Sequence, residues 1–200
     1  WQSKGDEFDS RMLHFSKKTS FKSFKLLIMN IEDVIESQNT KDLHLVASQF
    51  CTFIEKIQPF QQQDAMEYLI KIIPLLYIKG ILIPHFEFDE EENMAIRLLT
   101  EEEYEIAYLA IKEKFDTYNY FEFFNQSINQ VESIDLSELI ADLYQDLKDF
   151  VLFFNQNTFR SQSAALWLCR VNFYERWGKI ITQLLAYLHP LLFPSQVNDY

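Results

Sequence analysis

Two hundred residues are enough for one domain with a sizeable core, and 48% apolar side chains is an ordinary share for a globular protein. The 3 glycines and 5 prolines are fewer than β-hairpins and sandwiches usually need, so long helices with few connections are expected. The formal net charge of −12 argues against nucleic acid as a partner, because phosphate backbones require a basic surface.

The chain begins with an arm that we leave out of the predicted fold. It starts at Trp1 and has a methionine only at Met12, so residues 1–11 are interpreted as partly vector-derived or flexible, within an arm that extends to residue 19. Between Ser10 and Ile31 there are five bases and no acid. We expect this basic first helix to be solvated; the alternative is that it contacts an anionic lipid surface or the acidic body of the protein.

Three helices are predicted in the first half of the chain from apolar residues at steps of three and four. The first covers about 21–35 and the second about 43–57, and the segment SQNTKD between them has stopping and capping residues. The third covers about 62–83, with a kink expected near Pro74 and an end at Pro84.

An acidic connection, read mainly as a loop, leads to the sequence TEEEY. Thr100 and Glu103 form a capping-box pattern that predicts a helix from there to about Phe115. The aromatic segment 117–131, TYNYFEFFNQSINQV, has apolar residues at helical steps and is predicted to be a shorter helix.

Two long helices are expected to close the domain as an antiparallel pair. Asp135 and Glu138 form a second capping-box pattern, and a heptad-like seam follows to Phe154. A similar seam runs from Leu166 to Leu188 after the short segment NQNTFRSQS. The predicted fold is therefore all-α: one antiparallel helical bundle of about six or seven helices over residues 20–193, followed by a tail at 194–200.

Four carboxylates in the sequence SELIADLYQDLKDF form the main candidate site. Glu138, Asp142, Asp146 and Asp149 share one helix face, which should lie beside the apolar seam and not in the core. We expect a solvated face, because charge runs on helices usually face water. The alternative is a Mg²⁺ or Mn²⁺ site built on Glu138, Asp142 and Asp146, as in all-helical nucleotide pyrophosphatases, with the segment DEEEN or Glu175 as a second source of acids.

A third interpretation of the same residues is a structural polar network. Arg170 occupies an inward step of the last helix, where a buried guanidinium needs a partner. Asp142 or Asp146 on the neighbouring helix is the expected partner, through a forked pair.

Several classes of site have no signature in the sequence. Cys51 and Cys169 are far apart, so neither a disulfide framework nor a zinc site is indicated, and a cytoplasmic protein is expected. The most apolar run, residues 70–84, is too short to span a bilayer and contains two lysines. No cofactor is predicted, since Gly-rich phosphate loops and GxSxG or HExxH motifs are not found. We interpret His189 as a helix-end histidine.

The order of several short motifs resembles a known family. ADLYQDLKDF, ALWLCRVNFYERWG and LHPLLF, preceded by IIPLLYIKG and TEEEY, make the chain similar to bacterial proteins grouped as domain of unknown function five-zero-six-three, over about residues 42–193. The resemblance implies an all-α cytoplasmic protein and no particular activity. It also implies an acid after the first Trp of the last helix, where this chain has Leu168.

The sequence favours a non-enzymatic helical module that binds a protein partner, with the acidic helix face and aromatic surface as candidate contacts. The alternatives are a divalent-metal-dependent hydrolase using Asp142 and Asp146, and a carrier of an apolar ligand between aromatic-lined helices.

Overall fold

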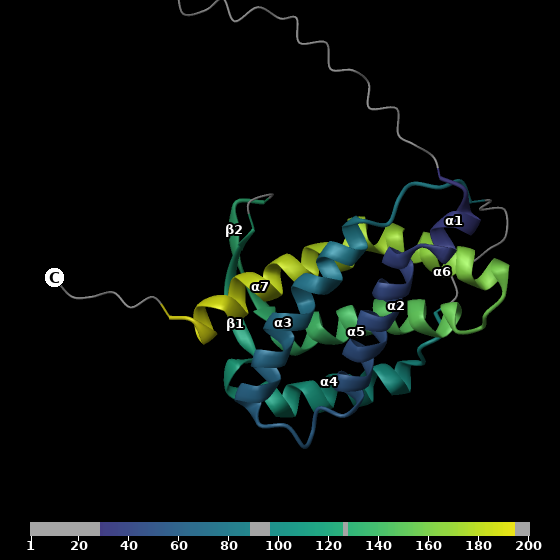
Figure 1. Ribbon diagram of the computed structural model, residues 1–200. Coiled ribbons are helices and arrows are strands. Elements are labelled where there is room, and N and C mark those ends of the chain that lie inside the picture. The colour runs from purple at the N-terminus through teal and green to yellow at the C-terminus, as the bar shows by residue number, and fades with distance from the viewer. Residues whose placement is uncertain (1–28, 89–96, 126–127, 195–200) are drawn as a thin grey trace, which may run out of the picture.

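The computed structural model describes residues 29–88, 97–125 and 128–194 (Figure 1). These residues form one mainly helical domain, which confirms the predicted fold class. The helices are α1 (Ile31–Glu36), α2 (Gln38–Glu55), α3 (Gln62–Ile81), α4 (Glu101–Phe115), α5 (Leu136–Phe154), α6 (Phe159–Asn172) and α7 (Gly178–Leu192). The predicted basic helix falls mostly in residues 1–28, and the segment DEEEN at 89–93; both lie outside the described residues.

Side-chain caps determine where several helices begin. Ser37 alone separates α1 from α2, because its hydroxyl accepts a hydrogen bond from the backbone N–H of Thr40 at 3.2 Å. The rest of the expected SQNTKD connection is therefore helical. At α4 the capping box is confirmed: Thr100 Oγ1 accepts from the Glu103 N–H, and Glu103 Oε2 accepts from the Thr100 N–H. At α5 the carboxylate of Asp135 accepts from the N–H groups of Ser137 and Glu138, whereas no return bond from Glu138 is formed among the described residues, so only half of the predicted second capping box is present.

The aromatic segment after α4 is a hairpin, so the predicted shorter helix is wrong. Strand β1 (Tyr120–Asn125) pairs antiparallel with β2 (Gln130–Asp135), and Phe124 lies opposite Val131. Phe121 and Phe124, which suit a helical step of three, lie on opposite faces of β1 because side chains alternate along a strand. Six aromatic or β-branched residues in these strands favour extended backbone over helix.

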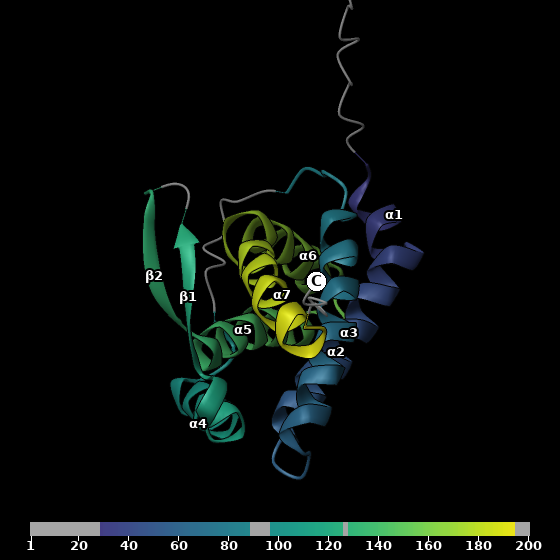
Figure 2. The same cartoon turned by 90° about the vertical axis from the view of Figure 1, so that its left-hand side faces the viewer.

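Helix α5 lies in the middle of the domain and packs against α2, α4, α6 and α7. Figure 2 shows α2 and α3 on one side of α5 to α7, and α4 and the hairpin on the other. The expected packing of α5 against the following helix is confirmed for α6. That following helix is not uniform, however, because a π-helical turn, η3 (Phe173–Trp177), separates α6 from α7. The chain after η3 packs mainly on α3.

The crossing of η3 and α3 depends on Gly80. A Cβ atom at this position would overlap the ring of Trp177 and lie 2.7 Å from Cδ2 of Phe173. Trp177 is fully buried there, and its indole N–H donates to the carbonyl of Cys169 at 3.0 Å. Glycine therefore lets the two helices approach closely. None of the helices in the described ranges has the length and apolarity needed to cross a membrane.

Candidate functional site

The four carboxylates of α5 lie at very different depths. Glu138 is exposed and Asp142 and Asp149 are half-buried, whereas the side chain of Asp146 is only 2% exposed. The expectation that the whole face lies beside the core is thus wrong for Asp146. The reason is that α6 and η3 cover this part of α5, which burial estimates from one helix alone do not take into account.

Two of these carboxylates fasten α5 to the segment around the start of α4. Asp142 Oδ1 accepts a hydrogen bond from the Tyr104 hydroxyl at 3.0 Å. Asp149 Oδ1 accepts from the backbone N–H groups of Leu98 and Leu99 at 2.9 and 2.8 Å. Both interactions stabilise the packing of α5 against this segment, so both side chains already have hydrogen-bond partners.

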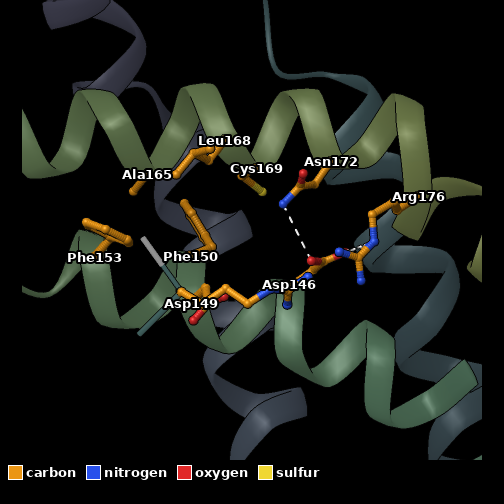
Figure 3. A pocket seen from close by; sticks show the side chains of 10 residues that line it. Asp146, Asp149, Phe150, Phe153, Ala165, Leu168, Cys169, Asn172 and Arg176 are labelled. Atoms are coloured by element: carbon orange, nitrogen blue, oxygen red, sulfur yellow. Dashed lines mark hydrogen bonds and ion pairs between the residues drawn. The ribbon is translucent and has the colours of Figure 1, made fainter. Parts of the chain in front are cut away.

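The partners of Asp146 come from α6 and η3. Its Oδ1 accepts from Asn172 Nδ2 at 3.5 Å, and its Oδ2 lies 3.5 Å from Arg176 Nε (Figure 3). Both distances are long, so Asp146 is held by weak contacts. Within the described part of the chain, Oδ2 makes no hydrogen bond.

Arg170 does not take the place that the sequence suggested. Its guanidinium lies over the ring of Tyr174, 5.1 Å from the ring centroid, and its Nε makes no hydrogen bond to the described residues. Arg176 approaches Asp146 in its place. Arg170 lies two residues before Asn172 in α6, about 200° around the helix from it, so it faces away from Asp146 whereas Asn172 faces it. Asn172 and Arg176, four residues apart, were the signal in the sequence.

The carboxylates do not converge as a metal site would require. Across residues 29–88, 97–125 and 128–194, no group of three or more His, Cys, Asp or Glu side chains is placed to hold an ion. Glu175, the suggested second source of acids, is exposed on η3.

A cavity of about 190 Å³ lies between α5 on one side and α6 and η3 on the other. One part of its wall is polar, with Asp146 between Asn172 and Arg176 in Figure 3; the other part is apolar. The polar wall consists of Arg97, Asp146, Asp149, Asn172 and Arg176, and the apolar wall of Phe150, Phe153, Ala165, Leu168 and Cys169. We call this space the α5–α6 cavity. Leu168, where the family resemblance implies an acid, belongs to its apolar wall.

Burial controls the electrostatics of this cavity. It raises the pKa of Asp146 to about 6, and the nearby carboxylates of Asp142 and Asp149 act in the same direction, against the guanidinium groups of Arg176 and Arg97. Burial also raises the pKa of Asp149, although two backbone N–H groups oppose it. The pKa of the Cys169 thiol is raised by its complete burial, so this thiol stays protonated and is a poor nucleophile.

The hairpin forms a second candidate surface, with three large apolar side chains on its outward face. Tyr120, Phe124 and Val131 are 64%, 51% and 60% exposed. Figure 2 shows β2 on the side away from the helices, and the described sheet has only these two strands, so the outer edge of β2 is unpaired in it. Edge strands of soluble proteins are usually protected by lysine, proline or a cover, yet β2 contains neither residue.

The hairpin is fixed to the bundle on its inner face. The ring of Phe121 stacks on Tyr187 of α7, with centroids 4.0 Å apart and planes at 9°. The Tyr187 hydroxyl donates to the carbonyl of Tyr118 at 2.8 Å. At the base, the buried side chain of Asn119 accepts from the Ser137 N–H at 3.0 Å. These contacts therefore hold the hairpin against the bundle while its outward face stays exposed.

Comparison with known proteins supports the resemblance seen in the sequence. Residues 34–194 match a family model described as "Domain of unknown function (DUF5063)". Among solved structures, the crystal structure of protein BF1032 from Bacteroides fragilis is similar, with 27% sequence identity and a TM-score of 0.71 over 82% of this chain and 98% of that chain. No protein with a curated description matches.

Proposed function

Because this chain belongs to the DUF5063 family, whose description assigns no activity, its function has to be inferred from its own surfaces, and we propose that it is a non-enzymatic protein-interaction module. The observation that carries this proposal is the hairpin, which combines an edge strand unpaired in the described sheet with an exposed apolar face. Extended segments of partner proteins add to such edges through backbone hydrogen bonds, and alternate side chains supply specificity.

The charge of the hairpin indicates the chemistry of the partner. Glu122, Glu132 and Asp135 give the segment 119–135 three acids, and it contains no Lys or Arg. A partner strand that alternates apolar and basic residues would bury the apolar ones beside Phe124 and Val131 and place the basic ones near the acids. A second copy of this acidic chain would instead bring like charges together.

The other candidate contacts are less suitable. The acidic face of α5 is not free, because Asp142 and Asp149 are hydrogen-bonded and Asp146 is buried. A metal-dependent hydrolase lacks support for the reason given above, that the described acids do not converge. A carrier of a purely apolar ligand is disfavoured at the α5–α6 cavity, which has four charged side chains in its wall.

The cellular setting that we propose is the bacterial cytoplasm. Cys51 and Cys169 are both free and buried, which suits a reducing compartment. The similar protein BF1032 comes from a bacterium.

The proposal is tested with a synthetic seven-residue peptide that alternates valine and lysine, labelled for fluorescence anisotropy. We expect it to bind the full chain, and a version with glutamate in place of lysine to bind at least about tenfold more weakly, equivalent to about 1.4 kcal/mol. Val131→Lys should abolish or strongly weaken binding, because it adds a positive charge beside the β2 edge.

Ile106→Lys on α4 is the matched control. Ile106 is also a β-branched apolar residue, and its 63% exposure is close to the 60% of Val131, so both variants should fold equally well. Equal peptide binding by the two variants would refute the hairpin as the contact surface. A dimer in sedimentation that dissociates on Val131→Lys would make a second copy the occupant, contrary to the proposal.

A further inference from the structure

The α5–α6 cavity has a buried acceptor that the protein itself does not satisfy. Asp146 is almost completely buried, yet its Oδ2 makes no hydrogen bond to any described residue and has only the 3.5 Å contact with Arg176 Nε. Buried carboxylate oxygens nearly always have a donor, because desolvating an unpaired acceptor is costly. The lining of the cavity therefore favours a ligand that brings a donor to Asp146 (Figure 3).

The sum of the lining charges restricts that ligand further. Arg97 and Arg176 contribute two positive charges, and Asp146 and Asp149 two negative charges, so the formal total is zero. A simple cation would meet both arginines and a simple anion both aspartates. A molecule that carries one charge of each sign and no net charge fits both pairs.

The remaining wall is apolar and the space is small. Phe150, Phe153 and Leu168 offer contacts for an aliphatic or aromatic group. The 190 Å³ volume corresponds to roughly six water molecules at about 30 Å³ each. This is suitable for a molecule of amino-acid size.

We propose that the α5–α6 cavity binds a small zwitterion of the α-amino acid type with an apolar side chain, its ammonium group on Asp146 and its carboxylate on Arg97. Asp149 Oδ1 already accepts two backbone hydrogen bonds, whereas both oxygens of Asp146 have only contacts of 3.5 Å, so we assign the ammonium group to Asp146. Arg97 is exposed at the cavity, so its guanidinium binds the carboxylate of the ligand without breaking a buried ion pair. This inference is independent of the hairpin.

Isothermal titration of the full chain with L-valine, L-leucine, L-methionine and L-phenylalanine tests the proposal. At least one of the four should bind with a Kd below about 10 mM. For the tightest binder, the matching amine without the carboxylate and the matching acid without the ammonium group should each bind at least about tenfold more weakly. Failure of all four to bind, or an analogue that binds as tightly as its parent amino acid, would overturn the proposal.

Two variants locate the site. Asp146→Asn keeps the shape of the side chain and removes the charge, and Arg97→Gln changes an exposed residue, where substitutions usually alter stability little. Each should weaken binding by about tenfold or more, whereas Arg160→Gln, an exposed position of α6 outside the cavity, should leave Kd unchanged. Unchanged affinity in Arg97→Gln would contradict the assignment even where Asp146→Asn folds poorly.

Discussion

Asp146 is a carboxylate in the interior with weak contacts on both oxygens, so its charge is stabilised less than burial demands. In many buried ion pairs the desolvation penalty exceeds the attraction between the partners unless the geometry is close and further hydrogen bonds are made. Here Arg176 and Arg97 lower the pKa of Asp146, but burial together with Asp142 and Asp149 outweighs them. The folded protein therefore holds the proton of Asp146 more tightly than the unfolded chain does.

This difference predicts a specific pH dependence of stability. The pKa of Asp146 rises from 3.8 to about 6 on folding, so its contribution to stability is complete below pH 3.8 and is lost as the pH rises through about 6. Relative to Asp146→Asn, which does not titrate, the wild-type free energy of unfolding should fall by about 1 to 3 kcal/mol across this window. Urea denaturation of both proteins at several pH values between about 4 and 7 measures the difference. A difference that stays constant with pH would contradict the raised pKa.

The partners of Asp146 show which contacts can be predicted from sequence spacing and which cannot. The sequence predicted that Asp146 lies on a solvated face beside the core, which is wrong because α6 and η3 cover this part of the regular helix α5. Arg170 was chosen by extending the same spacing along the partner helix. That choice is wrong because Arg170 lies about 200° around the helix from Asn172, the α6 residue that contacts Asp146, and Arg176 was missed.

At the scale of elements, the contact between α3 and η3 depends on a single missing side chain. Gly80→Ala should lower the free energy of unfolding by about 1 to 3 kcal/mol, because the new methyl group would displace the rings of Trp177 and Phe173. Gln49→Ala, at an exposed position of α2, is the control and should change it by less than about 0.5 kcal/mol. A thermal or urea melt distinguishes the two, and equal stabilities would show that α3 and η3 separate without cost.

The inner face of the hairpin stacks on Tyr187, which leads to a second prediction for an element. Isolated two-stranded hairpins are marginally stable in water, so the stacking of Phe121 on Tyr187 should be needed to keep β1 and β2 paired. Tyr187→Ala should speed hydrogen exchange in 120–135 by about tenfold, with α2 and α5 unaffected. Tyr187→Phe, which keeps the ring and removes the hydrogen bond to Tyr118, should have a smaller effect. Equal acceleration throughout the chain would instead indicate global destabilisation.

The same hairpin is the element that the sequence did not predict. Apolar residues at 121, 124, 128 and 131 fit a helix. The competing strand pattern, in which Phe121 and Phe123 share one face and Glu122 and Phe124 the other, is short. A two-stranded ribbon beside a bundle buries only one face, and here it does so against α7, through a contact between Phe121 and Tyr187 that are far apart in the chain. The only local feature that favours the strands is the β-propensity of their aromatic and β-branched residues, and the helical spacing competes with it. By contrast, the helix from Thr100 to Phe115 has its start encoded by its own capping box, and it was predicted correctly.

Over the whole molecule, the helices can be predicted from the sequence because each buries one stripe of apolar side chains against its neighbours. The two proposed binding surfaces cannot be predicted in this way. The α5–α6 cavity unites Arg97, Asp146 and Arg176 from three separate segments. The hairpin surface exists only because β1 and β2 pair. Both depend on tertiary contacts, and they lie in different electrostatic settings: the cavity lining is formally neutral, and the hairpin is acidic on an acidic protein.

These settings predict opposite responses to salt. The acids of the hairpin attract a basic strand across solvent, and such attraction is screened when the Debye length falls from about 10 Å at 0.1 M to about 3 Å at 1 M. Raising NaCl from about 0.05 to about 0.5 M should therefore weaken binding of the valine–lysine peptide by about tenfold, mainly through slower association. Amino acid binding in the cavity should change less than about twofold, because a site of zero net charge with a neutral ligand gains little from long-range attraction. Anisotropy and calorimetry at the two salt concentrations measure both. A peptide affinity that does not depend on salt would remove the electrostatic basis for a basic partner, while leaving the cavity assignment intact.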